Sequence, residues 1–263
     1  MDDSQFSEPT RRWLASGRHL EIEGKRVFLY ERGGGQSILM LHGFPTSAYD
    51  WRGVIDGLAS AYRCVALDFP GYGLSDKPEA YSYSLFQQTD VVEALARELS
   101  ITEAHVVSHD VGTSVHTELL SREQEGRLVF RLLSSTFLNG SMLQDHIDDV
   151  RSVMKRPESL SEDDIVVMND LIAYQEGNRR LPALSLYMRE RYIHRERWIG
   201  ALKKTKRIQF IWADGDPVAN VDLGRALSKE VPQARYTELA GLGHFLLMED
   251  PKAVATRIRD FLT

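Results

Sequence analysis

The feature that most constrains the fold is an alternation of short apolar runs with longer stretches of helical periodicity. Several runs are apolar at nearly every position, as a strand covered on both faces requires. Between them, apolar residues recur every three or four positions over 84–99 and 111–123. Strands that alternate with helices indicate a mostly parallel α/β sheet flanked by helices. The predicted strands are 26–32, 37–43, 63–69, 104–110, 128–135, 207–214 and a short run at 235–239, before a closing helix at 251–262.

The alternation stops between 139 and 206, where three stretches have helical periodicity and none resembles a strand. They read SMLQDHIDDVRSVMKRP, SEDDIVVMNDLIAYQEG and LPALSLYMRERYIHRERWIGALKK, with prolines as punctuation. This composition is typical of a helical insertion above a sheet. We therefore expect a core formed by 1–138 and 207–263 and a helical cap formed by 139–206. The glycines of 33–35 predict a hairpin turn between the first two strands.

Charge and cysteine content narrow the class of protein. The net charge of −6 is spread over interspersed signs, so no face predicts binding to nucleic acid or to anionic lipid. The single cysteine, Cys64, lies in the apolar run YRCVALDF and predicts a buried thiol. The acidic start resembles no secretory signal, and no stretch is long enough to cross a bilayer. We expect a soluble cytoplasmic protein without a membrane partner; its oligomeric state is not readable from the sequence.

Candidate catalytic residues follow three of the predicted strands. Asp110 follows HVVSH and precedes a helix, Asp216 follows QFIWADG, and His244 lies in the glycine-rich loop LAGLGHF. Ligands of open α/β sheets bind outside the carboxyl ends of the strands, so these side chains are expected to meet. Asp214 competes with Asp216 as the acid, although its place at the strand end favours a turn-capping role.

Five motifs in a fixed order resemble one superfamily. They are LHGFPTSAYDW at 41–51, DFPGYGLSDKP at 68–78, SHDVG at 108–112, and the acid and histidine loops. Together they are similar to the α/β-hydrolase superfamily, within it the aspartate-nucleophile branch of epoxide hydrolases and haloalkane dehalogenases. The insertion is most similar to bacterial relatives of the mesoderm-specific transcript proteins. The resemblance implies an α/β-hydrolase fold with a small helical cap.

An aspartate at the nucleophile position selects a particular chemistry. A carboxylate is already ionised at neutral pH and can displace a leaving group from saturated carbon to form an ordinary alkyl ester. Asp110 is the expected nucleophile, His244 the base that activates water against the ester, and Asp216 the residue that orients His244. The resemblance implies that the backbone N–H groups of Phe44 and Val111 stabilise the oxyanion.

Asp110 and His244 each have an alternative, non-catalytic role in local structure. An aspartate that opens a helix is a favourable N-cap, which is the alternative for Asp110. His244 is alternatively a loop histidine bonded to a carbonyl group. Ser108 and Gly112 are read as the small residues that a tight nucleophile turn requires.

The choice of electrophile depends on the cap. An epoxide oxygen leaves as an alkoxide and needs an acidic hydroxyl group, for which Tyr187 is the first candidate, with Tyr174 and Tyr192 also available. A halide needs N–H donors, and Trp198 is the candidate in the cap, although a tryptophan at helical spacing is more often core. Val111 stands where dehalogenases carry tryptophan. The predicted activity is hydrolysis of an epoxide to a vicinal diol; the alternative is a haloalkane or haloacid dehalogenase.

The sequence also allows predictions about metals, cofactors and binding partners. His42 is expected to brace the oxyanion loop, and His105, His109 and His116 lack a set of metal-ligating partners. No cofactor is implied, because side chains and water suffice for the mechanism. The expected partners are a small apolar organic substrate and water. The alternative of another class is a non-catalytic binding module on the same fold.

Overall fold

A computed structural model of the chain describes residues 6–140 and 150–263. Eight strands form one sheet in the order β1-β2-β4-β3-β5-β6-β7-β8. The pairs β1/β2 and β2/β4 are antiparallel and all other pairs are parallel. The strands are β1 (Arg18–Ile22), β2 (Lys25–Arg32), β3 (Gln36–Leu41), β4 (Tyr62–Leu67), β5 (Glu103–His109), β6 (Arg131–Leu138), β7 (Ile208–Ala213) and β8 (Arg235–Leu239).

The sheet is the mostly parallel one that the sequence predicts, with two corrections. The segment 33–35 makes no hairpin, because β2 and β3 do not pair and β4 lies between them. The hairpin joins β1 to β2 instead, through Glu23 and Gly24, whose φ angles of 53° and 70° are positive. The strand predicted at 128–135 starts later, at Arg131, and ends at Leu138.

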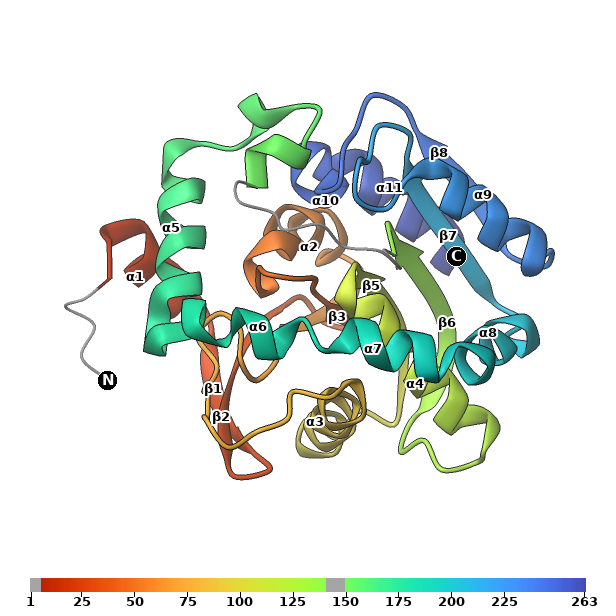
Figure 1. Cartoon of the computed structure of the whole chain (residues 1–263), viewed down its shortest axis with the longest axis horizontal. Helices are drawn as coiled ribbons and strands as arrows, with labels where there is room; N and C mark the ends of the chain where they lie inside the picture. Colours follow the sequence, from red (N-terminus) through yellow and green to blue (C-terminus); the bar gives the residue numbers. More distant parts are fainter. Residues whose placement is uncertain (1–5, 141–149) are drawn as a thin grey trace.

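Alternating side chains on each strand supply two separate cores. On β3, Ile38 and Met40 belong to a cluster with Val54 of α2 (Arg52–Leu58) and with residues of α11 (Pro251–Leu262). Leu39 and Leu41 belong to a second cluster, which includes residues of α3 (Leu85–Glu98) and α4 (Val111–Gln124). Helices therefore cover both faces of the sheet, as Figure 1 shows, and this explains why the central strands are apolar at almost every position.

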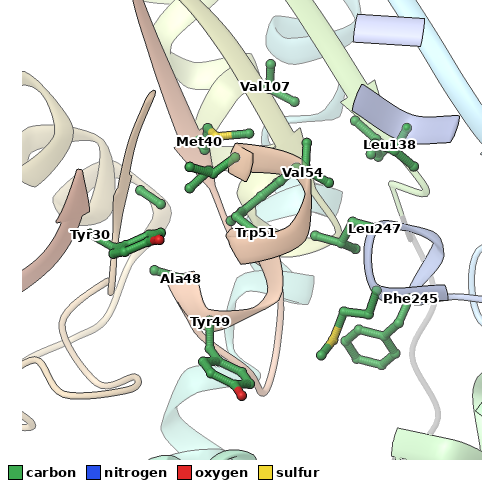
Figure 2. Packing of buried hydrophobic residues seen from close by; sticks show 14 of the residues in the cluster. Tyr30, Met40, Ala48, Tyr49, Trp51, Val54, Val107, Leu138, Phe245 and Leu247 are labelled. Carbon is green, nitrogen blue, oxygen red and sulfur yellow. The ribbon is translucent and has the colours of Figure 1, made fainter. Parts of the chain in front are cut away.

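The first of these cores includes the loop that follows β3. Trp51 ends the short helix η2 (Ala48–Trp51) and is fully buried. Figure 2 shows its ring between Met40 of the sheet and Val54 of α2, with Leu247 of α10 (Leu246–Glu249) close by. This packing holds the loop after β3 against the loop that contains His244. The two loops carry residues of the candidate site described below.

The remaining helices of the core flank the sheet at its two ends. Helix α1 (Glu8–Ser16) packs against α5 (Glu162–Ala173) of the cap, and α9 (Val221–Glu230) packs against β7. Figure 1 shows α1 at the left edge of the molecule and the C-terminus near β7. Within the described residues, no helix is long and apolar enough to span a membrane.

The segment between β6 and β7 contains helices and no strand among its described residues. The predicted helix at 141–157 falls partly on 141–149, which lie outside the described residues, and its remainder forms short 3-10 turns. The predicted helix at 181–204 is divided into three. In Figure 1 they follow one another across the front of the molecule towards α4. The elements are η3 (Val150–Val153), η4 (Pro157–Ser159), α5 (Glu162–Ala173), η5 (Tyr174–Arg180), α6 (Leu181–Leu184), α7 (Tyr187–Ile193) and α8 (Arg195–Lys204).

Candidate active site

The turn between β5 and α4 presents Asp110 in a strained backbone conformation. Its φ angle is 46° and its ψ angle is −114°, a combination that L-residues rarely adopt. A Cβ atom on Gly112 would lie 2.4 Å from the Leu41 carbonyl oxygen, so only glycine fits there. Asp110 occupies the N-cap position of α4, but its side chain makes no capping hydrogen bond. The carboxylate therefore makes contacts other than those of a helix cap.

Those contacts come first from the loop after β3. The Phe44 backbone N–H donates a hydrogen bond of 2.8 Å to Asp110 Oδ1. A Cβ atom on Gly43 would lie 2.6 Å from Asp110 Cβ, so the absence of a side chain there permits this approach. Val111 is buried at the first position of α4, where the helix supplies no acceptor for its N–H. The Phe44 N–H therefore contacts the carboxylate, and Val111 follows Asp110 directly in the chain; the stabilising role implied for the two N–H groups stays a prediction.

His244 lies between two carboxylates from different loops. Its Nδ1 is 2.8 Å from Asp216 Oδ2, and its Nε2 is 3.9 Å from Asp110 Oδ2. Asp214, the competing acid, instead accepts a hydrogen bond from the Gly241 N–H and is exposed. The structure therefore brings Asp110, His244 and Asp216 together and leaves Asp214 outside.

Asp216 is itself fixed by the backbone. Its Oδ1 accepts hydrogen bonds from the Val218 and Ala219 N–H groups, at 2.7 and 2.9 Å. Both Asp216 oxygens are thereby occupied, one by the backbone and one by His244. Such bonds determine the orientation of the His244 ring and place its Nε2 towards Asp110.

The charges around His244 favour its protonated form. Burial by itself disfavours the cation, but the charge and hydrogen bond of Asp216, followed by the charges of Asp110 and Asp50, outweigh burial and raise the pKa of His244 above its ordinary value. Among the described residues, His244 Nε2 has no hydrogen-bond partner. A ring nitrogen that is buried and without a partner in this position can exchange a proton with a small bound molecule.

Asp50 is a third carboxylate near His244, and the sequence analysis did not single it out. It is 1% exposed, and burial raises its pKa to about 7. The Thr46 hydroxyl donates to its Oδ2, whereas its Oδ1 lacks a partner among the described residues. The available signal was an acidic residue between Tyr49 and Trp51 in the motif LHGFPTSAYDW.

Two further histidines support the loops rather than carry protons. His42 Nδ1 donates to the Gly43 carbonyl group at 2.8 Å, and its Nε2 accepts from the Phe69 N–H at 3.0 Å. His109 Nε2 donates to the His244 carbonyl group at 2.9 Å. Burial lowers the pKa of both His42 and His109 to about 4, so both are neutral near pH 7. The bracing role expected for His42 agrees with these bonds.

The cap contributes Tyr187 to this region. Tyr187 is 2% exposed, and its ring centroid lies 6.4 Å from that of Phe44. Burial and then the Asp110 charge raise the pKa of Tyr187, although the neighbouring Arg191 acts in the opposite direction. The hydroxyl therefore stays protonated at neutral pH, as a proton donor must.

Arg191 lies one helical turn after Tyr187 and was missed from the sequence. Its guanidinium carbon is 4.7 Å from the centre of the Tyr187 ring. Its Nη2 donates to the Asp110 carbonyl oxygen at 3.1 Å, and its Nε donates to Ser114 Oγ. The spacing of four residues from Tyr187 was the available signal, because it places both side chains on one helix face.

A second buried tyrosine, Tyr72, was also missed, because the motif DFPGYG drew attention to its glycines. The Tyr72 ring lies 5.0 Å from the His42 ring and 6.4 Å from the Phe44 ring. Burial, followed by the nearby Tyr187 and Asp110, raises its pKa well above the ordinary value. Tyr72 and Tyr187 therefore approach the Asp110 region from the core and from the cap.

The other three cap residues named from the sequence lie elsewhere. Tyr174 packs against Phe6, with ring centroids 5.2 Å apart. Tyr192 is 85% exposed. Trp198 is buried, and its Nε1 donates to Glu118 Oε2 at 3.0 Å. The structure does not bring these side chains to Asp110, because the cap helices are separated by turns whose directions depend on packing.

The histidines of the described ranges are also candidate metal ligands. Among the described residues, no group of three His, Cys, Asp or Glu side chains is placed to hold a metal ion. His105 forms hydrogen bonds with the side chains of Ser134 and Gln36. His116 forms hydrogen bonds with the hydroxyl groups of Ser108 and Ser135. Each of these histidines is used in hydrogen bonds between core elements.

The chain was compared with known families and proteins. Residues 38–257 match the model of the Alpha/beta hydrolase family. LipZ of Mycobacterium tuberculosis is 34% identical, over 95% of this chain and 96% of LipZ. The mesoderm-specific transcript homolog protein of Bos taurus is 30% identical, over 98% of this chain and 89% of that protein.

Two solved structures share the fold at lower identity. The epoxide hydrolase CorEH superposes with a TM-score of 0.77 and 20% identity, over 93% of this chain and 97% of CorEH. The haloalkane dehalogenase DbeA of Bradyrhizobium elkani superposes with a TM-score of 0.80 and 21% identity, over 94% of this chain and 97% of DbeA. At these identities the likeness establishes the fold.

Proposed function

Because the chain belongs to the Alpha/beta hydrolase family, we propose that it hydrolyses an electrophile at saturated carbon through an ester of Asp110, and that the electrophile is an epoxide. The observation that carries the proposal is the position of Asp110. Its carboxylate accepts the Phe44 N–H at one oxygen and faces His244 Nε2, 3.9 Å away, with the other. A carboxylate presented in this way suits attack on carbon rather than helix capping.

In the first step, Asp110 Oδ2 attacks an epoxide carbon and the carbon–oxygen bond breaks. The electron pair moves to the epoxide oxygen, which takes a proton from the Tyr187 hydroxyl. Tyr187 supports this role because it is buried close to Phe44 and is protonated at neutral pH. The product is an alkyl ester of Asp110 that carries a neighbouring hydroxyl group.

In the second step, water adds to the ester carbonyl of Asp110 while His244 Nε2 accepts a water proton. The negative charge develops on the oxygen that the Phe44 N–H already contacts. The acyl–oxygen bond then breaks, His244 returns its proton to the departing alkoxide, and the acidic proton of the regenerated Asp110 returns to Tyr187. One epoxide and one water give one diol.

The charge on Asp110 coordinates the two steps. In the free protein, that charge is one of those that raise the pKa of His244. Once Asp110 is esterified the charge is gone, so the pKa of His244 falls and a larger fraction of the ring is neutral. The base thus becomes more available in the intermediate, where it is needed.

The available hydrogen-bond donors favour an epoxide over a halide. A leaving halide needs N–H donors, but Trp198 Nε1 is engaged by Glu118 and Val111 offers no side-chain donor. An alkoxide needs a proton, which the buried Tyr187 hydroxyl can supply. This distinction rests on side-chain chemistry and not on the fold, which epoxide hydrolases and dehalogenases share.

The test uses the His244→Gln variant, which is expected to form the ester and not to hydrolyse it. The variant is incubated with a panel of epoxides and alkyl halides. The mass of the intact protein is then measured, and any adduct is located by proteolytic mapping. A mass gain equal to a whole epoxide on Asp110 supports the proposal. A gain equal to an alkyl group without its halogen would instead make the protein a dehalogenase.

Tyrosine variants test the proton donor in the same assay. Tyr187→Phe is expected to slow ester formation from epoxides by about 10²-fold, within the usual range for a lost general acid. Tyr192→Phe is the matched control from the same helix, because its side chain is 85% exposed. If Tyr187→Phe alkylates at the unchanged rate, Tyr187 is not the proton donor. If no electrophile modifies Asp110, the covalent mechanism itself is refuted.

A further inference from the structure

A cavity of about 290 Å³ lies between α4, α8 and α9 and reaches the strands β6 and β7. Most of its wall is apolar, and two of the wall residues, Trp198 and Trp212, are buried tryptophans. None of Asp110, His244 and Tyr187 lines it. The cavity is therefore separate from the reacting groups, although Ser114 in its wall belongs to the first turn of α4. Its apolar wall consists mainly of Phe137, Trp198, Ile199, Leu202, Trp212 and Leu227.

The guanidinium of Arg191 is part of this wall, and within 6–140 and 150–263 no carboxylate pairs with its charge. Arg191 is 3% exposed and bonds to the Asp110 carbonyl oxygen and to Ser114 Oγ. No carboxylate in the described part of the chain forms an ion pair with it, and its Nη1 has no acceptor there. A buried cation is normally paired, so an acceptor that the described residues do not provide points to a ligand that supplies it.

The other charges at the cavity do not oppose an anion. Glu230, at the cavity, is 3.6 Å from Arg195 and 3.0 Å from Lys203, so two cations balance one carboxylate. The Asp110 side chain is another negative charge near Arg191, but its carboxylate accepts the Phe44 N–H and does not line the cavity. The polar end of the cavity is therefore positive, and its remainder is apolar.

We propose that this cavity is a second binding site, for a medium-chain monocarboxylate. The alkyl chain lies among the apolar wall residues, and the carboxylate accepts hydrogen bonds from Arg191. At roughly 30 Å³ for a water-sized group, the volume holds about ten non-hydrogen atoms. Octanoate has this size, and its planar carboxylate matches the fork of a guanidinium.

The site is tested by calorimetric titration of the whole protein with octanoate and with octan-1-ol at pH 7.5. Octanoate is expected to bind at one saturable site, at least tenfold more tightly than the alcohol. Arg191→Met should lower the affinity for octanoate at least tenfold and leave octan-1-ol unchanged. Arg189→Met is the matched control, because Arg189 is exposed on the same helix and does not line the cavity.

A second variant retains Arg191 and fills the cavity. Leu227→Trp should abolish octanoate binding, whereas Asp110→Ala should keep it, since the Asp110 side chain is not part of the wall. The proposal is overturned by the absence of saturable binding, by equal affinities for acid and alcohol, or by octanoate binding that survives Leu227→Trp. If Arg191→Met fails to fold, the acid–alcohol comparison and Leu227→Trp still decide. All these readouts are independent of the proposed epoxide chemistry.

Discussion

The two ends of helix α4 differ in how far the buried polar and charged groups around them are paired. At its C-terminal end, the Arg122 guanidinium is buried and forms ion pairs with three carboxylates. One of them, Glu118, also accepts from Arg197 and from the Trp198 indole. The buried charges of Arg122 and Glu118 thus all have partners. The network joins α3, α4 and α8 and has the properties of a structural contact.

At the N-terminal end of α4, the backbone is strained and several buried polar atoms lack partners in the described part of the chain. Asp110 has a positive φ of 46° and makes no capping bond. Arg191 is buried without an ion pair among the described residues, and His244 Nε2 has no partner there either. Strain and unpaired polar atoms cost stability, and they persist where they serve a chemical purpose. From this difference we infer that the C-terminal end of α4 stabilises the fold and propose that the N-terminal end serves the chemistry.

The largest expected effect comes from removing the group that the strained turn presents. Asp110→Ala is expected to lower turnover by at least about 10³-fold, because no other carboxylate occupies that position. Folding should be kept, since the side chain contributes one hydrogen bond, from Phe44. The measurement is steady-state turnover together with thermal unfolding by circular dichroism. Turnover equal to that of the parent protein would contradict the assignment of this end to chemistry.

The next largest effect is expected at the opposite end and in stability. Glu118→Ala should lower the free energy of unfolding by about 3–5 kcal/mol, because it leaves buried cations without their partner. Glu125→Ala is the control, since this partly exposed carboxylate also pairs with Arg197 and should cost about 1 kcal/mol or less. Urea unfolding measures both. Equal losses in the two variants would show that burial does not distinguish the pairs.

A smaller effect is expected in the titration of His244. Asp110→Asn removes one of the charges that raise the pKa of His244, so this pKa should fall. Because its folded-state pKa is raised, His244 stabilises the fold below about pH 6.5. That contribution is lost as the pH rises through the folded-state pKa, and in the variant it should be lost at a lower pH.

NMR of the histidine ring nitrogens measures this shift, and stability against pH provides the second readout. Asp214→Asn is the control, because Asp214 is exposed and bonds to the Gly241 N–H rather than to His244. An unchanged pKa of His244 in Asp110→Asn would mean that the two side chains are not coupled across their 3.9 Å separation. Esterification of Asp110 would then not lower the pKa of His244.

The smallest effect is expected at Tyr192, which defines the baseline of the comparison. Its side chain is 85% exposed, so Tyr192→Ala should change the free energy of unfolding by no more than about 0.5 kcal/mol. Turnover should be unchanged as well. A loss of turnover in this variant would show that the cap reaches the substrate through a face other than that of Tyr187 and Arg191.

Much of the candidate site could be located from the sequence because its parts are local. The turn at Asp110, the acid loop at Asp216 and the loop at His244 each follow a strand, and the strands of a parallel sheet end at one edge. The small residue demanded at Gly112 is equally local, since it depends on one close backbone approach. Proximity of the three side chains thus follows from topology.

The cap could be predicted as helical, but its contribution to the site could not. Tyr174, Tyr187 and Tyr192 all lie in stretches of helical periodicity, and packing decides that Tyr187 is buried beside Phe44 while Tyr192 is exposed. The direction of each cap helix depends on the turns between helices and on contacts with the core. Arg191 was missed for the same reason.

By itself, the sequence determined the alternation of strands and helices, the order of the five motifs and hence the fold and the family. These follow from periodicity and from short-range backbone requirements, which are properties of neighbouring residues. Only the tertiary structure decided that Asp216 and not Asp214 meets His244, that Asp50 adds a third carboxylate, and that Arg191 is buried without an ion pair among the described residues. Such facts depend on which distant segments come into contact, because burial and pairing are set by the whole packed chain.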